Sequence, residues 1–309
     1  MEKVMSFAKP LVSIGMPVYN SERFLTEALD SLVAQTFTDF ELVISDNAST
    51  DGTEEICRAC AARDRRIRYM RNEMNVGVYR NFNRVFQASS GEYFKWASAD
   101  DVCHRDLIVR CLEVLDRDPT VVLVYPKTIF IDETGSPLGW KDPGWDLQSD
   151  AAHERMRYVI YAGHWVNTFY GLIRADVLKK TRLFPSYNSG DYRLIGELSL
   201  HGKFVETHEY LFSRRIHRGA SSQNPAVEWQ TKYTTGRSGP PGLPSWHLCF
   251  DHLITVLRSQ LRFKQKLSLG SAVTHRMYLK RRELLGELMI ATKGYTKNWF
   301  RRQTTPAEG

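Results

Sequence analysis

Long apolar runs are missing from this sequence of 309 residues. No segment approaches the roughly 18 consecutive apolar residues that a membrane-spanning helix requires. The N-terminal stretch from Met1 to Pro10 also lacks the apolar centre of a secretory signal. With 42% hydrophobic and 25% charged residues, the composition is that of an ordinary soluble globular protein. We therefore expect a cytoplasmic protein.

Cysteine is also scarce, with five residues scattered along the chain. Cys57 and Cys60 form a Cys-x-x-Cys pair, but this pair lies within a helical pattern. It lacks the second pair of ligands that a zinc site of this kind needs. We expect free thiols rather than a redox or metal site.

Two glycine-rich phosphate-binding motifs are absent as well. The turn after the first predicted strand has no Gly-x-Gly-x-x-Gly, and no Gly-Lys-Ser loop of the Walker type occurs. These absences exclude the common dinucleotide and P-loop sites. A nucleotide bound to this chain would instead need a carboxylate for the base, an aromatic ring for stacking and a metal for the phosphates.

Apolar strand patterns alternate with amphipathic helix patterns in the first third of the chain. The order is β-α-β-α-β-α-β, with short connections and strands that are apolar throughout. It predicts a parallel sheet with helices on both faces and functional groups in the loops after the strands. The strands are expected from Leu11 to a break at Pro17, then at 40–44, 67–70 and 92–97.

The fourth of these strands stops on two adjacent carboxylates, Asp100 and Asp101. Adjacent carboxylates repel each other unless a cation or hydrogen-bond donors are present. A hard divalent cation such as Mg²⁺ or Mn²⁺, shared with a substrate phosphate, suits oxygen ligands of this kind. The alternative is structural, with Asp101 as the N-cap of a helix that runs through Leu107 and Leu115.

Four short motifs together resemble a known family. Pro17-Val18-Tyr19-Asn20 follows the first strand, and a polar run from Ser45 to Thr53 ends the second. Asn75-Val76-Gly77 follows the third strand, and Ala99-Asp100-Asp101 follows the fourth. In this order and with these gaps, the motifs resemble family 2 glycosyltransferases of the GT-A fold, over about residues 11 to 218.

The resemblance implies both a fold and an activity. The fold would be α/β, a Rossmann-like and mostly parallel sheet with helices on both faces, followed by a helical C-terminal extension. Members of the family transfer a sugar from a nucleotide diphosphate donor with inversion, usually with Mn²⁺ or Mg²⁺. We expect a UDP-sugar as donor, the hydroxyl of a saccharide or lipid-linked molecule as acceptor, and a role in cell-surface polysaccharide or glycolipid synthesis.

The resemblance also assigns roles in donor binding. Asp46 would hydrogen-bond the nucleobase, and Pro17 and Tyr19 would wall the base pocket. Asp100 would bind the metal as the aspartate of a D-x-D motif, in which Ser98 or Ala99 replaces the earlier carboxylate that commonly contacts the ribose. The residues expected to bind nucleotide and donor are Pro17, Tyr19, Asp46, Asn75, Gly77, Ala99, Asp100, Gly171 and Arg215.

Later residues complete the expected site. Gly171 resembles a glycine that lets the backbone approach the donor sugar closely. Asp191 stands where the family places its catalytic base, although Gly190 replaces the first member of the usual acidic pair. The structural alternative for Asp191 is a helix cap. His217 would be a second metal ligand or a diphosphate contact, and arginines beside it such as Arg215 could bind phosphate oxygens.

We expect four parts along the chain. Residues 1–125 would form the nucleotide-sugar-binding half of the GT-A domain, and residues 126–218 the acceptor-binding and catalytic half. Residues 219–244 are expected to be a flexible linker or lid, and residues 245–309 a basic helical extension. A loop near the acceptor side carries Trp140 and Trp145, which either stack on a sugar or serve as local packing.

Positive charge is concentrated in the extension. Twelve lysines and arginines between Arg258 and Arg302 face only Glu283 and Glu287, so this stretch carries +10 while the whole chain carries +7. Such a segment indicates an anionic partner, and we expect a membrane surface rather than nucleic acid. Basic amphipathic helices would make the protein peripheral on the inner face of the cell membrane. Alternatively, the helices only pack on the catalytic domain and keep their basic face in solvent.

Two other functions compete with this interpretation. A nucleotidyltransferase would need a basic phosphate loop after the first strand, which Pro17-Val18-Tyr19-Asn20 does not supply. A non-catalytic sugar-nucleotide-binding or membrane-associated protein on a degenerate GT-A fold fits the departures at Ser98, Ala99 and Gly190.

Overall fold

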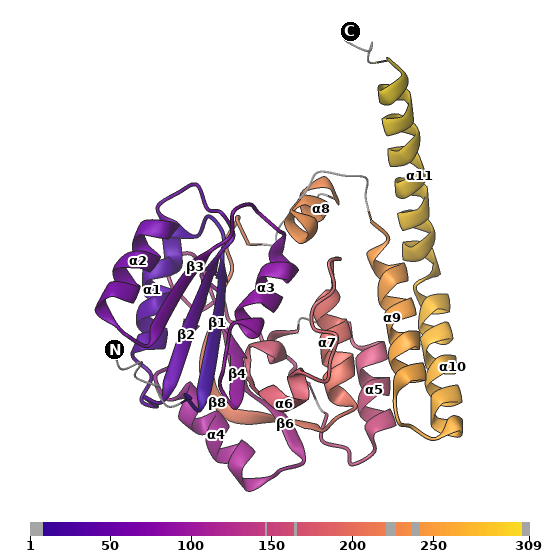
Figure 1. The fold of residues 1–309 in the computed structure, drawn as a ribbon. Coiled ribbons are helices and arrows are strands. Elements are labelled where there is room, and N and C mark those ends of the chain that lie inside the picture. Colours follow the sequence, from indigo (N-terminus) through magenta and orange to yellow (C-terminus); the bar gives the residue numbers. More distant parts are fainter. Residues whose placement is uncertain (1–8, 146, 164–165, 221–226, 237–241, 305–309) are drawn as a thin grey trace, which may run out of the picture.

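The computed structural model describes residues 9–145, 147–163, 166–220, 227–236 and 242–304 (Figure 1). Its centre is one eight-stranded sheet with the order β3-β2-β1-β4-β7-β6-β8-β5. The strands are β1 (Val12–Val18), β2 (Phe40–Asp46), β3 (Ile67–Arg71), β4 (Tyr93–Trp96), β5 (Val102–Cys103), β6 (Val121–Ile131), β7 (Leu172–Arg174) and β8 (Lys203–Arg215).

The first four strands form the predicted parallel sheet. β1 lies between β2 and β4, and β3 pairs with the outer side of β2. β1 and β2 are buried along nearly their whole length, which explains why both appear in the sequence as continuous apolar runs. Because these strands are parallel, the loops after β1, β2 and β4 meet at one end of the sheet.

Pro17 lies inside β1, so the strand break predicted at this residue is wrong. The backbone N–H of Ala97 donates a hydrogen bond to the carbonyl of Gly15. Alternate residues of a strand direct their backbone polar groups to the same side, so those of Gly15 and Pro17 both face the β4 side. β4 ends at Trp96. The nitrogen of Pro17 therefore faces no strand, and its missing N–H costs no ladder hydrogen bond.

The second half of the sheet is mixed. β7 is antiparallel to both β4 and β6, whereas β6 and β8 are parallel to each other. β6 is a single strand that continues across Pro126. The pairing with β8 shifts register around Pro126 and Lys127, and this irregularity accommodates a residue that cannot donate to the ladder.

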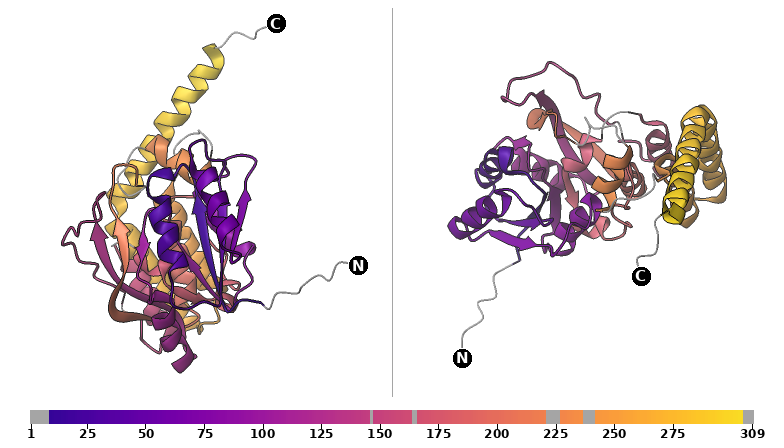
Figure 2. Two further views of the ribbon diagram at one scale, coloured as in Figure 1. Left: turned by 90° about the vertical axis from the view of Figure 1, so that its left-hand side faces the viewer. Right: turned by 90° about the horizontal axis from the view of Figure 1, so that it is seen from above.

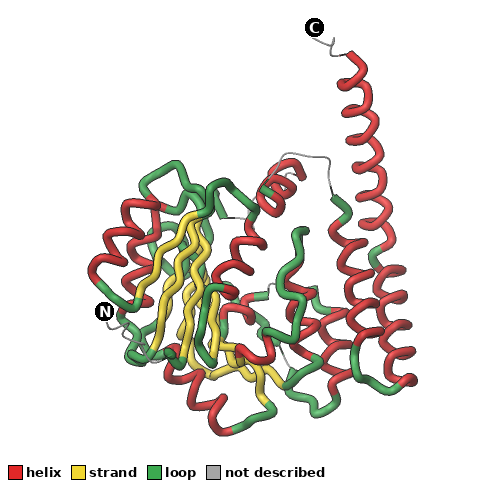
Figure 3. The backbone as a smooth tube through the Cα atoms, in the orientation of Figure 1, coloured by secondary structure: helices red, strands yellow, loops and turns green. Residues whose placement is uncertain are grey.

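Helices cover both faces of the sheet (Figures 1 and 3). One apolar cluster joins one face to the helices α1 (Glu22–Val33), α2 (Thr53–Arg63) and α4 (Leu107–Arg117). A second cluster joins the other face to α3 (Val78–Gln87), α5 (Ala152–Tyr161), α6 (Ala175–Leu178) and α7 (Gly190–Ser199). Buried aromatic rings contribute to the second cluster, and Phe94 meets Trp96 edge-on at 4.8 Å between centroids.

The C-terminal extension is helical, as predicted. It contains α9 (Pro244–Arg258), α10 (Phe263–Leu279) and α11 (Arg281–Thr304), and α8 (Val227–Thr235) precedes it. α9 and α10 share an apolar cluster with α5, while α11 continues past them (Figures 1 and 2). α10 and α11 are separated at Lys280. None of the described helices is long and apolar enough to span a bilayer.

Candidate active site

A cavity of about 590 Å³ opens where the loops after β1, β2 and β4 meet. The end of β1, the starts of α1 and α3, and the loop after β4 supply most of its wall. Six of the predicted site residues line it, namely Pro17, Tyr19, Asn75, Ala99, Asp100 and His217. Five others, Asp46, Gly77, Gly171, Asp191 and Arg215, are not in its lining.

Asp100 and His217 form the polar centre of this cavity. His217 Nε2 lies 2.9 Å from Asp100 Oδ2, and Ser98 Oγ donates to Asp100 Oδ1. The backbone N–H of Gly219 donates to His217 Nδ1 at 3.2 Å, which leaves Nε2 as the protonated nitrogen that faces Asp100. Burial raises the pKa of Asp100, but the hydrogen bonds from His217 and Ser98 outweigh it and hold the pKa below its usual value.

Asp101 has a different role from its neighbour and is not the helix cap that the structural alternative predicted. β5 intervenes between Asp101 and α4, which begins only at Leu107. The Asp101 carboxylate is buried and accepts the backbone N–H of Arg215 at 2.8 Å. Burial and the adjacent charge of Asp100 both raise its pKa.

Arg215 supports the loop that carries Asp100 and does not reach the cavity. Its guanidinium donates to the carbonyls of Asp100 at 3.0 Å and Asp132 at 3.1 Å, and to Glu27 Oε2 at 2.6 Å. Only 1% of the side chain is exposed. These contacts fix the backbone of Asp100 from the side away from the cavity. The expected contact of Arg215 with a donor stays a prediction.

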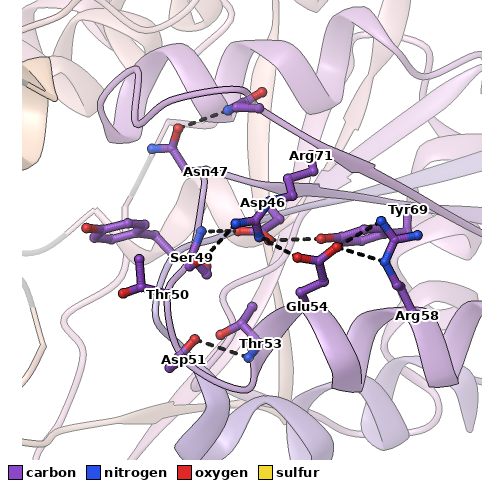
Figure 4. Close-up of polar contacts among 12 residues, drawn as sticks. Asp46, Asn47, Ser49, Thr50, Asp51, Thr53, Glu54, Arg58, Tyr69 and Arg71 are labelled. Atoms are coloured by element: carbon purple, nitrogen blue, oxygen red, sulfur yellow. Dashed lines mark hydrogen bonds and ion pairs between the residues drawn. The ribbon is translucent and has the colours of Figure 1, made fainter.

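Asp46 is held by its own neighbours at the end of β2 (Figure 4). Its Oδ1 accepts the backbone N–H of Ser49 at 2.8 Å, and its Oδ2 accepts from the Tyr69 hydroxyl at 2.8 Å and from Arg71. Burial, followed by the hydrogen bond to Asp46, raises the pKa of Tyr69 to about 12. The fully buried carboxylate of Asp46 thus stabilises the loop after β2, and base recognition by it stays a prediction.

Asn47 follows β2 directly and is not among the residues expected to bind the donor, yet it lines the cavity next to Asp46. Its Oδ1 accepts from Asn72 Nδ2 at 2.9 Å and from the N–H of Val76 at 3.0 Å. Its Nδ2 donates to Asn75 Oδ1 at 2.9 Å, and the same oxygen accepts the N–H of Gly77 at 2.8 Å. This network joins the loops after β2 and β3, so the predicted motif Asn75-Val76-Gly77 shapes the cavity mainly through Asn75.

Glycine is required at two of the predicted positions. Gly77 has φ of 88°, and a Cβ there would collide with the carbonyl oxygen of Thr234 near the end of α8. A Cβ on Gly171 would collide with the carbonyl oxygen of Val124 in β6. Gly171 therefore permits close packing of its segment on β6, while the neighbouring Tyr170 lines the cavity.

α8 contributes Lys232 and Tyr233 to the cavity wall, although it lies in the segment predicted to be a linker or lid. Parts of that segment, 221–226 and 237–241, fall outside the described residues. In the described part of the chain, Lys232 has no acidic partner, whereas Arg23 at the cavity is paired with Glu133 at 2.5 Å. Lys232 thus brings a positive charge to the cavity wall.

Asp191 occupies the first turn of α7, whose N-cap is Ser189. Its Oδ1 accepts the backbone N–H of Tyr192 at 3.0 Å. Burial raises the pKa of Asp191 to about 6, although that hydrogen bond and the charge of Arg214 act in the opposite direction. A carboxylate with this pKa is ionised at neutral pH and still basic enough to accept a proton.

The two tryptophans of the loop before α5 differ in environment. Trp145 is buried and packs against Tyr158 and Tyr192, with centroid separations of 5.9 and 6.0 Å. Trp140 is 48% exposed and lies 5.9 Å from the ring of Phe130. Local packing accounts for Trp145, and of the two only Trp140 presents a ring to solvent.

The residues present are compatible with a divalent cation. Within the described residues, no group of three or more histidine, cysteine or acidic side chains is arranged as metal ligands. Asp100 Oδ2 and His217 Nε2 lie 2.9 Å apart at the cavity, and Nε2 would become a ligand when a cation replaces its proton. Mg²⁺ and similar cations often bind through one or two carboxylates plus substrate phosphates and water, and such a site needs no larger protein cluster.

Comparison with known proteins agrees with the motifs. The family model described as Glycosyl transferase family 2 matches residues 13–181. The chain belongs to this family. It is 27% identical over 67% of its length to a chondroitin synthase of Pasteurella multocida and covers 21% of that protein. The chain thus spans less than a quarter of the length of this protein and of two other curated relatives that it matches.

Solved structures show that the fold is of the GT-A type. S. aureus TarS in complex with UDP-GlcNAc superimposes with a TM-score of 0.67 at 18% identity, covering 88% of this chain and 73% of that one. The mannosyltransferase PcManGT of Pyrobaculum calidifontis, in complex with GDP-Man and Mn²⁺, gives a TM-score of 0.52 at 15% identity over 91% and 79% of the chains.

Proposed function

We propose that this protein is an inverting hexosyltransferase that moves a sugar from a nucleotide diphosphate donor to an acceptor hydroxyl. The observation that carries the proposal is the Asp100–His217 pair in a cavity at the carboxyl ends of β1, β2 and β4. Ligands of open α/β sheets bind at this edge. Membership of family 2 adds the chemistry of sugar transfer.

The donor is a UDP-sugar in this proposal. The cavity volume of about 590 Å³ lies within the usual range for small-molecule sites. Tyr19, 43% exposed, offers a ring for stacking on the base, and Asn47 and Asn75 offer amide groups nearby. The ammonium of Lys232 suits the diphosphate. UDP as the nucleotide is supported by the related TarS structure, which contains UDP-GlcNAc.

We assign the cation site to Asp100 and His217. Mn²⁺ or Mg²⁺ bound there would neutralise negative charge on the diphosphate that leaves. Support comes from the fit of this residue pair and from the Mn²⁺ in the related mannosyltransferase structure. Arg215 and Ser98 position Asp100, one through its backbone carbonyl and the other through its carboxylate.

Asp191 is the proposed general base. The acceptor oxygen attacks the anomeric carbon and gives its proton to the Asp191 carboxylate. The bond from that carbon to the diphosphate oxygen breaks, and its electron pair leaves with the nucleoside diphosphate. The pKa of about 6 makes Asp191 both ionised and basic near neutral pH.

For the acceptor we propose a chemical class. A saccharide or lipid-linked acceptor, in cell-surface polysaccharide or glycolipid synthesis, is supported by the likeness to a chondroitin synthase. We also keep the division into a donor-binding half at 1–125, an acceptor and catalytic half at 126–218, a connecting segment at 219–244 and the extension at 245–309. Trp140 presents an exposed aromatic ring in this region for stacking on a sugar.

A non-catalytic sugar-nucleotide-binding protein is the second candidate, favoured by Gly190 in place of the first acidic residue before Asp191. The two candidates differ in turnover. The purified protein is incubated with UDP-sugars and Mn²⁺, and release of UDP is measured alongside thermal shifts. Enzyme activity predicts metal-dependent UDP release that Asp191→Asn reduces. Stabilisation by a UDP-sugar without any release, with or without oligosaccharide acceptors, would favour the binding protein.

A further inference from the structure

Exposed apolar side chains are concentrated on the C-terminal helices. Eleven of the sixteen large apolar side chains that are exposed in the described part of the chain lie between Phe250 and Ile290. Phe263 is 80% exposed, Leu257 69% and Leu267 66%. Scattered exposed apolar residues are normal, but a concentration on neighbouring helices marks an interaction surface.

On α9, the exposed apolar side chains lie on a different side of the helix from the residues that contact the catalytic domain. α9 turns Asp251, His252 and Thr255 toward α7 and its surroundings, where Asp251 pairs with Arg182 at 2.8 Å. Phe250, Ile254 and Leu257, spaced by four and three residues, form a separate stripe on α9. We use the name outer face for Phe250, Ile254, Leu257, Phe263, Leu267, Tyr278, Leu285, Leu288 and Met289.

α10 and α11 continue the same arrangement. α10 turns Ser268 and Arg276 toward α5, through hydrogen bonds to Arg157 and to the carbonyl of Ala162. Phe263, Leu267 and Tyr278 are exposed on α10, with Leu267 at the edge of a hollow that Arg157 and Tyr161 of α5 also line. On α11, Leu284 is buried, whereas Leu285, Leu288 and Met289 are exposed as neighbours on one stripe.

Positive charge borders the outer face. Arg281 lies over the ring of Tyr278 at 4.5 Å, directly beside it. Arg262 and Lys264 are exposed on either side of Phe263 in sequence. The acidic residues of this region are engaged elsewhere, since Glu283 accepts from Lys280 at 2.6 Å and Glu287 accepts the N–H of Ser245 at 3.0 Å. The outer face thus combines apolar side chains with a basic rim.

We infer that the outer face of α9, α10 and α11 docks on an anionic lipid bilayer surface. Apolar side chains of an interfacial helix enter the boundary between headgroups and acyl chains, and a basic rim binds anionic headgroups. A second copy of the chain would bring together two stretches that each carry +10, which repel each other. Charge therefore favours the bilayer over self-association.

Docking would attach the bilayer to helices that adjoin the start of α7, where the proposed base Asp191 lies. α9 begins close to the start of α7, where the ring of Tyr187 lies 5.3 Å from that of His247. α11 starts beside this end of α9, through the bonds of Ser245 to Glu283 and Glu287, and extends beyond it (Figure 1). The inference goes beyond the proposed function, because vesicle binding requires no turnover.

Vesicle flotation of the full chain tests the inference. Phosphatidylcholine vesicles with added phosphatidylglycerol are expected to carry the protein, and those without it to carry much less. Phe263→Ser combined with Leu267→Ser should lower binding at least about tenfold, because both side chains lose apolar burial. Lys264→Glu should lower it by about tenfold or more, through loss and reversal of one charge near the headgroups.

Matched controls lie far from the outer face in sequence. Met74→Ser removes a side chain that is 62% exposed, and Arg105→Glu reverses an exposed charge, and neither should change flotation. Absence of binding to anionic vesicles at low salt would overturn the inference. So would binding that survives the double substitution, or a solution dimer that the same substitution dissociates. UDP release in the same samples reports on the proposed function separately.

Discussion

Asp46 is the last residue of β2, and Asp100 follows β4 in the same parallel sheet. The Asp46 side chain is fully buried, whereas that of Asp100 is 29% exposed. Asp46 uses its acceptor capacity on Ser49, Tyr69 and Arg71 and lies outside the cavity. Asp100 shares its oxygens with Ser98 and His217 and lines the cavity. A polar side chain at the end of a strand is therefore available for chemistry only where its hydrogen-bond partners leave it exposed to the cavity.

The largest expected effect is loss of turnover in Asp100→Ala. Removal of this carboxylate takes away one of the two proposed cation ligands and leaves His217 as the other. We expect no measurable Mn²⁺-dependent UDP release, with the melting temperature nearly unchanged because the side chain lies at a cavity. Near-normal release by this variant, measured by a coupled UDP assay, would show that Asp100 is not needed for the chemistry.

Asp191→Asn should have the next largest effect. The amide keeps the size of the side chain but cannot accept a proton, so kcat should fall by about 10²–10⁴-fold with little change in donor affinity. In the wild type, protonation of Asp191 removes the base, and kcat/KM should therefore decline as the pH falls below about 6. Normal turnover with early melting would instead identify Asp191 as a structural residue of α7.

Asp46→Ala tests whether Asp46, unlike Asp100, contributes mainly to stability. It leaves Tyr69 and Arg71 without their shared acceptor, and we expect the free energy of unfolding to fall by about 2–4 kcal/mol. Arg71 retains Glu54 at 3.0 Å, which limits the loss. Urea unfolding measures the change in the free energy of unfolding, and Asp100→Ala serves as the matched variant for comparison. If Asp46 binds the nucleobase, the variant will also lose UDP affinity at temperatures where it remains folded.

Lys232→Gln should give the smallest effect. The side chain is exposed and lines the cavity, so loss of its charge should raise the KM for the donor by about tenfold, equivalent to ~1.4 kcal/mol. Lys232→Arg is expected to retain most of the affinity. An unchanged KM in Lys232→Gln would remove α8 from the donor site and confine it to the cavity wall.

The parallel half of the fold was predictable because buried strands leave long apolar runs and their loops carry turn formers. β7 was harder, since three residues carry little pattern and their place between β4 and β6 depends on long-range pairing. The prediction of a strand break at Pro17 was wrong for a similar reason. Sequence alone does not show that β4 stops before the proline nitrogen.

The candidate site was predictable where a motif names the residue. His217 lies 117 positions from Asp100, and only the family resemblance pointed to their meeting. Asn47 and Lys232 were not assigned to the donor site because their orientation depends on distant partners. Asn47 is oriented by Asn72 and Asn75, and Lys232 belongs to a helix in a segment whose Gly, Pro and Ser content indicated a linker.

Calorimetric titration of a UDP-sugar with and without Mn²⁺ tests the central claim most directly, because it measures donor binding without requiring an acceptor. If Asp100 and His217 hold the cation, Mn²⁺ strengthens donor binding to the wild type, and this gain disappears in Asp100→Ala and in His217→Ala. Equal strengthening by Mn²⁺ in the wild type and in both variants would contradict the assignment of the cation site to this pair.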